Sequence, residues 1–207
     1  MTARFVTLEG GEGVGKSTQL RALATALRGR GLDVLETREP GGSPGAEAIR
    51  KLLLDGTEER WLPEAEALLF AAARSDHVAR TIRPALGAGK WVLCDRFLDS
   101  SIAYQGGAGE LGFEAIRALH EVGSNGFLPD RTLLLRLDEG EAGRRAAARD
   151  QGSADLIGAR TDSYHRAVVA AFDRLAAESP ERFRIVDAAG APDEVTARLL
   201  AALEDLL

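Results

Sequence analysis

The feature that most constrains this chain is a glycine-rich octapeptide near its N-terminus. Residues 10–17 read GGEGVGKS and satisfy the pattern G-x-x-x-x-G-K-S/T. The octapeptide directly follows Phe5–Leu8, a run of strand-forming residues, and precedes residues 20–27, where apolar side chains recur at helical spacing. In this order, a strand, a glycine-rich turn and a helix let consecutive backbone N–H groups face phosphate oxygens. The sequence therefore predicts a P-loop, a binding site for nucleotide phosphates.

Two side chains of this loop carry its expected chemistry. The Lys16 ammonium is expected to reach the β- and γ-phosphates of the nucleotide, and the Ser17 hydroxyl to bind a magnesium ion. The residues expected to bind the nucleotide phosphates are Gly10, Gly11, Glu12, Gly13, Val14, Gly15, Lys16, Ser17 and Thr18. The motif leaves the reaction open, because P-loops occur in kinases, switches and motors alike.

Strand and helix patterns alternate along the rest of the chain. Compact apolar runs predict strands at residues 32–37, 91–94, 132–137 and 183–186. Helical patterns lie between them, near residues 49–53, 63–86, 112–122, 139–149, 162–178 and 192–206. On the helix at 63–86, we expect Leu68, Leu69 and Ala72 to form the apolar face. This alternation predicts a single three-layer α/β domain over residues 1–207, a P-loop NTPase fold whose five-stranded parallel sheet has helices on both faces.

Composition excludes several classes of protein. The chain has 26 basic and 32 acidic residues, a net charge of −6, and 45% hydrophobic residues. These values are typical of a globular protein and exclude wholesale disorder. The acidic balance argues against a nucleic-acid partner, although it allows an anionic small molecule in a local basic pocket.

Further sequence features bear on the compartment. The longest apolar run, 67–73, is too short to span a membrane, so no membrane partner is expected. Residues 1–9 lack the apolar segment of a signal peptide. Cys94 is the one cysteine of the sequence, which fits a reducing compartment. We therefore expect a cytoplasmic protein in which Cys94 is a small core residue.

A charged pair follows the third predicted strand. Ligands of open α/β sheets bind beyond the carboxyl ends of the strands, and Asp95-Arg96 directly follows the strand at 91–94. The Asp95 carboxylate is expected to hold magnesium or a water bound to it, completing the site that begins with Ser17. Arg96 is suited to hold a phosphate with two parallel hydrogen bonds, a geometry that lysine cannot match.

Four segments together resemble a known family. They are FVTLEGGEGVGKSTQ at 5–19, TREPGGS at 37–43, FAAAR at 70–74, and DRFLDSSIAYQGG at 95–107. In this order they are similar to bacterial thymidylate kinases, P-loop kinases that move the γ-phosphate of ATP to thymidine monophosphate (dTMP). The resemblance implies that the P-loop binds ATP with Mg²⁺, that the product dTDP serves dTTP biosynthesis, and that the chain forms a homodimer.

The resemblance also implies an acceptor site. Phe70 is expected to stack on the thymine ring and Arg74, one helical turn later, to donate to a ring carbonyl. Ser101 and Gln105 are expected along the base edge and Tyr104 against the sugar. The full set of implied acceptor-binding residues is Glu12, Glu39, Arg50, Phe70, Arg74, Arg96, Ser101, Tyr104 and Gln105. Glu39-Pro40 is expected to form a tight turn near the magnesium, in either peptide isomer.

A lid over the donor phosphates is assigned to residues 139–160 by the same resemblance. The implied catalytic residues are Lys16, Arg96, Arg145 and Arg149. The two lid arginines share one helix face. The family usually continues with Asp-Arg-x-Glu, whereas this chain reads Asp155-Leu156-Ile157-Gly158. This departure leaves open which lid arginine is catalytic, and Arg160 is a candidate to compensate.

Two alternatives to this function remain at the level of sequence. One is a kinase for another nucleotide or a small metabolite, which would share the P-loop and the strand-end aspartate. The other is a P-loop switch protein. Guanine switches normally carry an Asn-Lys-x-Asp string, and this sequence contains none.

Overall fold

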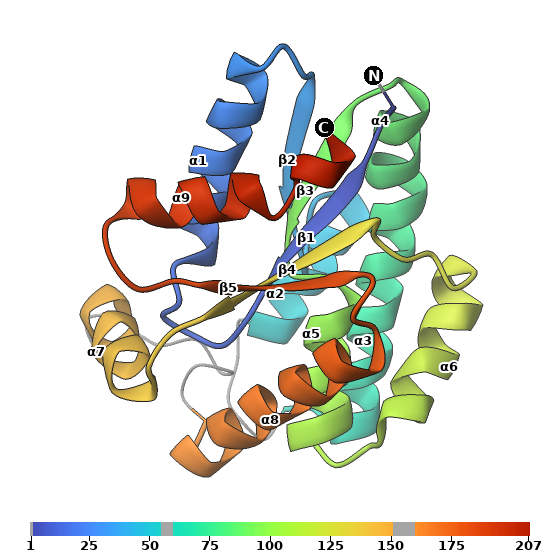
Figure 1. Ribbon diagram of the computed structural model, residues 1–207. Helices are drawn as coiled ribbons and strands as arrows, with labels where there is room; N and C mark the ends of the chain where they lie inside the picture. Colours follow the sequence, from blue (N-terminus) through green and yellow to red (C-terminus); the bar gives the residue numbers. More distant parts are fainter. Residues whose placement is uncertain (1, 55–59, 151–159) are drawn as a thin grey trace.

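The computed structural model describes residues 2–54, 60–150 and 160–207 (Figure 1). The described chain is organised around a five-stranded parallel sheet with the strand order β2-β3-β1-β4-β5. The strands are β1 (Phe5–Glu9), β2 (Val34–Arg38), β3 (Trp91–Asp95), β4 (Arg131–Arg136) and β5 (Phe183–Asp187). The predicted three-layer α/β fold is confirmed.

Helices cover both faces of this sheet. The α-helices are α1 (Lys16–Gly29), α2 (Pro44–Leu54), α3 (Pro63–His77), α4 (Arg83–Gly87), α5 (Leu98–Ser101), α6 (Phe113–Ser124), α7 (Glu139–Asp150), α8 (Asp162–Glu178) and α9 (Pro192–Ala201). Two π-helical segments, η1 (Val78–Ile82) and η2 (Ile102–Ala108), and a final 3₁₀ turn, η3 (Glu204–Leu206), complete the described elements. None of the helices in the described ranges is long and apolar enough to cross a bilayer.

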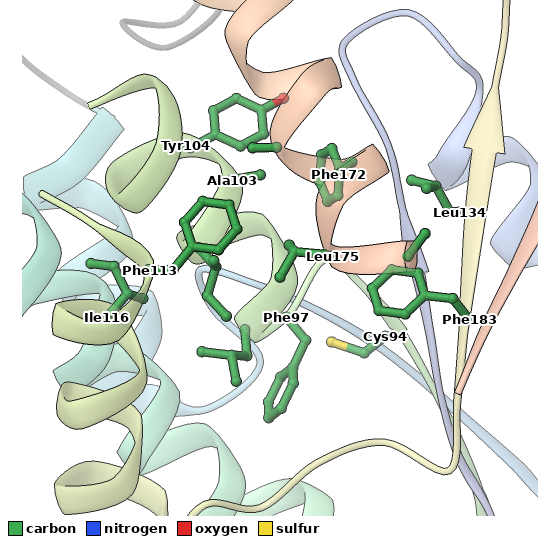
Figure 2. Close-up of a cluster of buried hydrophobic side chains, with 14 of the residues drawn as sticks. Cys94, Phe97, Ala103, Tyr104, Phe113, Ile116, Leu134, Phe172, Leu175 and Phe183 are labelled. Atoms are coloured by element: carbon green, nitrogen blue, oxygen red, sulfur yellow. The ribbon is translucent and has the colours of Figure 1, made fainter. Parts of the chain in front are cut away.

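The sheet separates two buried hydrophobic clusters. On one face, α1 and α9 pack against alternate strand residues such as Val6 and Leu8. On the other face, Cys94 lies in a cluster formed with α5, η2, α6 and α8 (Figure 2). Phe5 belongs to the same cluster. Cys94 is fully buried, as expected for a core residue, and burial raises the pKa of its thiol well above the usual value. Burial of apolar surface on both faces explains the near-continuous apolar strands.

The long helix predicted at 63–86 is divided into α3, η1 and α4. Pro84 lies in the first turn of α4 and has no N–H to donate to the preceding turn, which agrees with the local widening into a π-helical segment. Residues 98–108 also form helix, in α5 and η2, where no element was predicted. Three glycines and two serines lie within or next to that stretch, and their low helix propensity explains why the sequence did not predict a helix there.

The apolar face expected for α3 is wrong for Leu68 and Ala72, whereas Leu69 is half-buried. Leu68 is 56% exposed and Ala72 is also exposed. The buried residues of α3 are Ala67, Phe70, Ala73, Arg74 and His77. This set follows helical spacing but includes two polar side chains, because α3 buries them in a polar network beside a pocket rather than in an apolar core.

Parallel pairing brings the candidate functional segments to one edge of the sheet. Leu8 of β1 and Arg38 of β2 both lie opposite Asp95 of β3. The glycine-rich loop follows β1, and Glu39 follows β2. The carboxyl ends of these three adjacent strands therefore converge on one region, as expected for an open α/β sheet.

Candidate active site

The loop between β1 and α1 has the backbone conformation that its glycines allow. Gly10, Gly13 and Gly15 have positive φ angles of 137°, 73° and 88°. At Gly13, an added Cβ would lie 2.1 Å from the carbonyl oxygen of Ala142, so α7 approaches the loop more closely than a side chain permits. The loop thus curves around the N-terminus of α1 and touches the first helix of the expected lid.

Lys16 is buried at the start of α1. Its Nζ donates hydrogen bonds to the carbonyl oxygens of Gly10 and Gly11, at 3.1 and 2.6 Å. Burial, and after it the positive charge of Arg96, lowers the pKa of Lys16 to about 8. Nearby phosphate charge favours the ammonium form, so a bound nucleotide would keep this lysine protonated.

Ser17 and Asp95 meet at the mouth of the loop. The Ser17 hydroxyl donates to Oδ2 of Asp95 at 2.5 Å. Mg²⁺ takes oxygen ligands and is usually held by one or two protein groups, with phosphate and water filling the remaining positions. In the described ranges no group of three or more His, Cys, Asp or Glu residues could hold a metal. The Ser17 hydroxyl and the Asp95 carboxylate, side by side next to the phosphate loop, fit a magnesium ion that is bound together with a nucleotide.

Arg96 links the loop to the helix that follows β3. Nη1 donates to the Gly10 carbonyl at 3.1 Å and to the Ser100 hydroxyl at 3.0 Å. Nη2 donates to Oε1 of Glu12 at 2.5 Å and to the Tyr104 hydroxyl at 3.1 Å. The Arg96 backbone has a positive φ of 69°, an uncommon conformation for a side-chain-bearing residue. The four hydrogen bonds hold the Arg96 guanidinium between the P-loop and the residues expected to bind the acceptor.

A pocket next to Arg96 is lined by the residues implied for the acceptor site. All nine residues of that set line it, together with Pro40, Leu54, Phe97 and Ser100. A second pocket contains Glu12–Thr18, Asp95 and Arg145. The two pockets share Glu12, Glu39, Arg50 and Arg96 as lining residues. A phosphate in the first pocket would therefore lie beside the P-loop.

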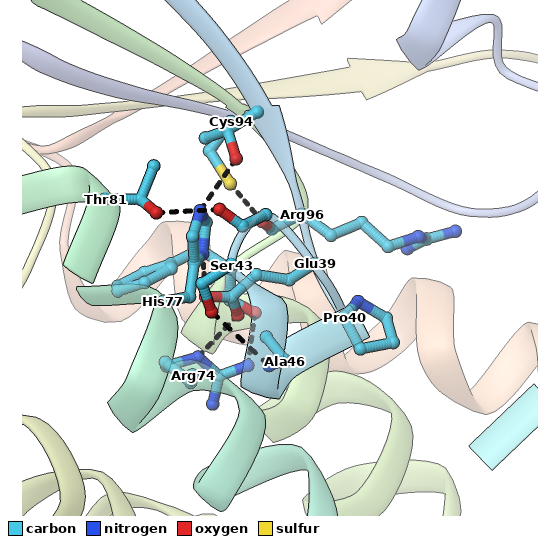
Figure 3. Close-up of polar contacts among 12 residues, drawn as sticks. Glu39, Pro40, Ser43, Ala46, Arg74, His77, Thr81, Cys94 and Arg96 are labelled. Atoms are coloured by element: carbon cyan, nitrogen blue, oxygen red, sulfur yellow. Dashed lines mark hydrogen bonds and ion pairs between the residues drawn. The ribbon is translucent and has the colours of Figure 1, made fainter. Parts of the chain in front are cut away.

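Glu39 organises one wall of the acceptor pocket (Figure 3). Its carboxylate accepts from Nε of Arg74 at 2.7 Å and is 3.0 Å from Nδ1 of His77. Nη2 of Arg74 donates to Ser101 Oγ at 2.8 Å and to the Phe97 carbonyl at 3.1 Å. The Glu39-Pro40 peptide, whose isomer the sequence left open, is cis. Arg74 is thus held in a fixed position in the wall of the pocket.

The lid region is described in part. Arg145 lines the P-loop pocket, and its Nη2 donates to Glu141 at 2.5 Å. Arg149 lies within α7, but its side chain is outside the described residues, as are Asp155–Gly158. Arg160 donates to Oε2 of Glu66 at 2.6 Å, so it is engaged beside the acceptor pocket.

Sequence reasoning missed a buried carboxylate behind Arg96. Glu9, the last residue of β1, accepts hydrogen bonds from the Phe97 N–H at 2.8 Å and the Ser100 hydroxyl at 2.5 Å. Burial, and after it the nearby Asp99 carboxylate, raises the pKa of Glu9 to about 8. The sequence signal that could have indicated this carboxylate is a glutamate at the end of a mostly apolar strand. Through Ser100, Glu9 helps to position Arg96.

Glu9→Gln is expected to change how stability depends on pH. Folding raises the pKa of Glu9, so the folded state binds the proton more tightly than the unfolded state. The stability that this proton adds to the folded state is lost as the pH rises from about 4.5 towards 8. Relative to Glu9→Gln, the wild-type free energy of unfolding should therefore fall between pH 5 and pH 8. Urea unfolding at both values measures this difference, with Glu64→Gln as an exposed control. Parallel pH profiles for wild type and Glu9→Gln would contradict the raised pKa.

The parallel sheet, the P-loop pocket and the acceptor pocket beside it form the arrangement expected of a P-loop phosphotransferase. The thymidylate kinase family model matches residues 8–199, and the chain belongs to this family. It is 64% identical to a thymidylate kinase of Rhizorhabdus wittichii, with 100% of both chains covered. It is 47% identical to a thymidylate kinase of Bradyrhizobium diazoefficiens, covering 99% of this chain and 90% of the relative.

A solved structure agrees with this membership. The crystal structure of thymidylate kinase from Ehrlichia chaffeensis superposes with a TM-score of 0.78 at 28% identity, and 99% of each chain is covered. The similarity therefore extends from the sequence motifs to the whole fold.

Proposed function

We propose that this chain transfers the γ-phosphate of ATP to dTMP, giving ADP and dTDP for dTTP biosynthesis. The observation that carries this proposal is the common wall of the two pockets, formed by Glu12, Glu39, Arg50 and Arg96. With this shared wall, an acceptor phosphate in one pocket would lie next to donor phosphates in the other, as transfer without a covalent intermediate requires. Family membership supports the choice of ATP and dTMP.

The reaction needs no general base. The second pKa of a phosphate monoester is about 6, so the acceptor is largely a dianion at neutral pH. Catalysis then consists of positioning the phosphates and stabilising the charge that develops during transfer. In this proposal Lys16 binds the β- and γ-phosphates, Arg96 holds the acceptor phosphate with Arg50, and Arg145 and Arg149 supply lid charge.

Mg²⁺ is part of the proposal. When bound with the nucleotide, it would neutralise phosphate charge, and Ser17 and Asp95 would hold it. Glu12 instead contacts Arg96 and Tyr104, on the side of the acceptor pocket. In this proposal the protein supplies the metal with the Ser17 hydroxyl and the Asp95 carboxylate at the mouth of the loop.

The base would lie between Phe70 and the polar wall. Phe70 is 8% exposed and lines the acceptor pocket, where its ring can support a pyrimidine. Arg74, one turn further along α3, supplies a donor for a keto oxygen. In this proposal the sugar contacts Tyr104, whose ring centre lies 4.9 Å from Cζ of Arg96.

A coupled ADP-release assay with a panel of nucleoside monophosphates tests the proposal. We expect dTMP to give the highest kcat/KM, ahead of dUMP, dCMP, dAMP and dGMP. A higher value for another acceptor would favour a different nucleotide kinase. Hydrolysis without an acceptor, combined with a preference for guanine nucleotides, would favour a switch protein.

We further propose that the chain forms a homodimer through α3 and α6. These helices pack against each other, and both expose apolar side chains. The exposed residues are Leu68, Ala72 and Ala79 on α3 and η1, and Ala115, Ala118 and Val122 on α6. Val122, the largest exposed apolar side chain of α6, is 88% exposed and so is available to a partner subunit. We also propose a cytoplasmic location, because Cys94 is a free thiol and thiols stay reduced in the cytoplasm.

Val122→Glu is expected to convert the dimer into a monomer. A carboxylate at this position would be buried without a partner in the proposed interface. Light scattering after size-exclusion chromatography should give twice 22.0 kDa for wild type and 22.0 kDa for the variant. Ile185→Glu, at a 59% exposed position on β5, is the matched control and should stay dimeric. A monomeric wild type would contradict the proposal.

A further inference from the structure

Glu66 connects the acceptor pocket to α8. It lies one helical turn before Phe70 in α3, and its side chain is 15% exposed. Oε1 accepts from Nε2 of Gln105 at 2.9 Å, and Oε2 accepts from Nη2 of Arg160 at 2.6 Å. Glu66 itself does not line the acceptor pocket, whereas Gln105 does. Any influence of Glu66 on a bound base must therefore act through Gln105.

We propose that Glu66 is a positioning residue that fixes the Gln105 amide and thereby selects a pyrimidine carrying N–H at ring position 3. An ionised carboxylate can only accept hydrogen bonds. The guanidinium of Arg160 donates to the second oxygen of Glu66, so both carboxylate oxygens act as acceptors. The Gln105 nitrogen must therefore face Glu66, because the reverse orientation would bring two acceptor oxygens together. The amide carbonyl oxygen is left as the polar atom for the pocket.

The resulting wall has a defined hydrogen-bonding pattern. Arg74 supplies donors, and the Gln105 carbonyl oxygen supplies an acceptor. Thymine and uracil present keto oxygens next to an N3–H donor, which complements this pair. Cytosine presents an amino group and an unprotonated N3, so it would place donor against donor and acceptor against acceptor. A site of this kind discriminates strongly, because the wrong base leaves buried polar groups unpaired.

A second set of contacts holds this arrangement in place. Arg160 donates from Nη1 to the hydroxyl of Tyr164 and lies 4.6 Å from the centre of its ring. The Tyr164 hydroxyl donates in turn to the backbone carbonyl of Tyr104 at 2.8 Å. Gln105 is therefore held through its side chain by Glu66 and through its neighbour's backbone by α8. Arg160 therefore contacts the side chains that hold Gln105, and it also lines the cavity between the P-loop and α7.

The inference rests on the proposed function, and its test separates the two. The variant is Glu66→Gln, which keeps the size of the side chain but can donate as well as accept, so it no longer fixes the amide. Steady-state kcat and KM are measured for dTMP, dUMP and dCMP. Glu64→Gln, an exposed position on the same helix, is the control. The wild-type arm reports on the proposed function, because a wild type that prefers dCMP contradicts both proposals.

In Glu66→Gln we expect the ratio of kcat/KM for dTMP to that for dCMP to fall at least about tenfold. The change should lie mainly in KM, with kcat for dTMP close to wild type, and dUMP should follow dTMP. In a Gln105→Ala background, adding Glu66→Gln should leave the ratio unchanged, since Glu66 acts through Gln105. An unaltered ratio in the Glu66→Gln single variant would overturn the inference. Equal losses for all three acceptors, or an undiminished effect in the Gln105→Ala background, would overturn it as well.

Discussion

Lys16→Ala is expected to lower kcat for dTDP formation by about 10²–10³-fold, the effect typical of removing one group that stabilises transition-state charge. Lys16 lies at the start of α1 with Nζ on the carbonyl oxygens of Gly10 and Gly11, inside the turn that would enclose the donor phosphates. Burial lowers the pKa of Lys16, so the charged ammonium adds little to the stability of the folded chain when no nucleotide is bound. Removing it should therefore spare folding while reducing catalysis.

Lys51→Ala is the matched control for this variant. Lys51 is exposed on α2, outside both pockets, and its removal should leave kcat within about twofold of wild type. Thermal unfolding of both variants checks that the fold is retained. A folded Lys16→Ala enzyme with wild-type kcat would show that the loop does not act on the transferred phosphate.

Arg96→Ala is expected to lower kcat/KM for dTMP by about 10²–10³-fold. Arg96 contacts Gly10, Glu12, Ser100 and Tyr104 at once, so its loss removes a phosphate ligand and also its hydrogen bonds to three residues that line the acceptor pocket. The loss should appear in kcat as well as in KM, because the acceptor phosphate must be aligned with the donor. Steady-state kinetics with dTMP varied at saturating ATP separates the two.

Two further variants sharpen this result. Arg96→Lys keeps the charge but not the planar fork, so it should recover only part of the lost activity. Arg30→Ala removes an exposed arginine that pairs with Glu204 far from either pocket, and it should behave like wild type. Full activity in Arg96→Lys would mean that charge alone, without two-pronged geometry, is sufficient.

The parts of the fold that sequence predicted well depend on local patterns. The central strands are largely apolar, because both faces of the sheet are covered there, and such runs can be found without knowing what covers them. The P-loop was predictable for a similar reason, since its strand, turn and helix are contiguous. The acceptor residues came from resemblance, and the structure brings all nine into one pocket.

The parts that sequence did not predict depend on contacts between distant residues. Glu9 meets Ser100, and Glu66 meets Gln105 and Arg160, across separations of 91, 39 and 94 residues. No local periodicity reports such pairs. The buried face of α3 was missed because it carries Arg74 and His77, whereas hydrophobicity alone favours Leu68. The polar network beside the pocket therefore overrode the usual pattern of an amphipathic helix.

The fate of the γ-phosphate tests the central claim most directly. The chain is incubated with γ-labelled ATP, Mg²⁺ and dTMP, and the labelled products are separated. Transfer between the two adjoining pockets predicts label in dTDP, with little label in inorganic phosphate while dTMP remains. Label released mainly as inorganic phosphate, or carried by a different acceptor in a mixture that includes dTMP, would contradict it.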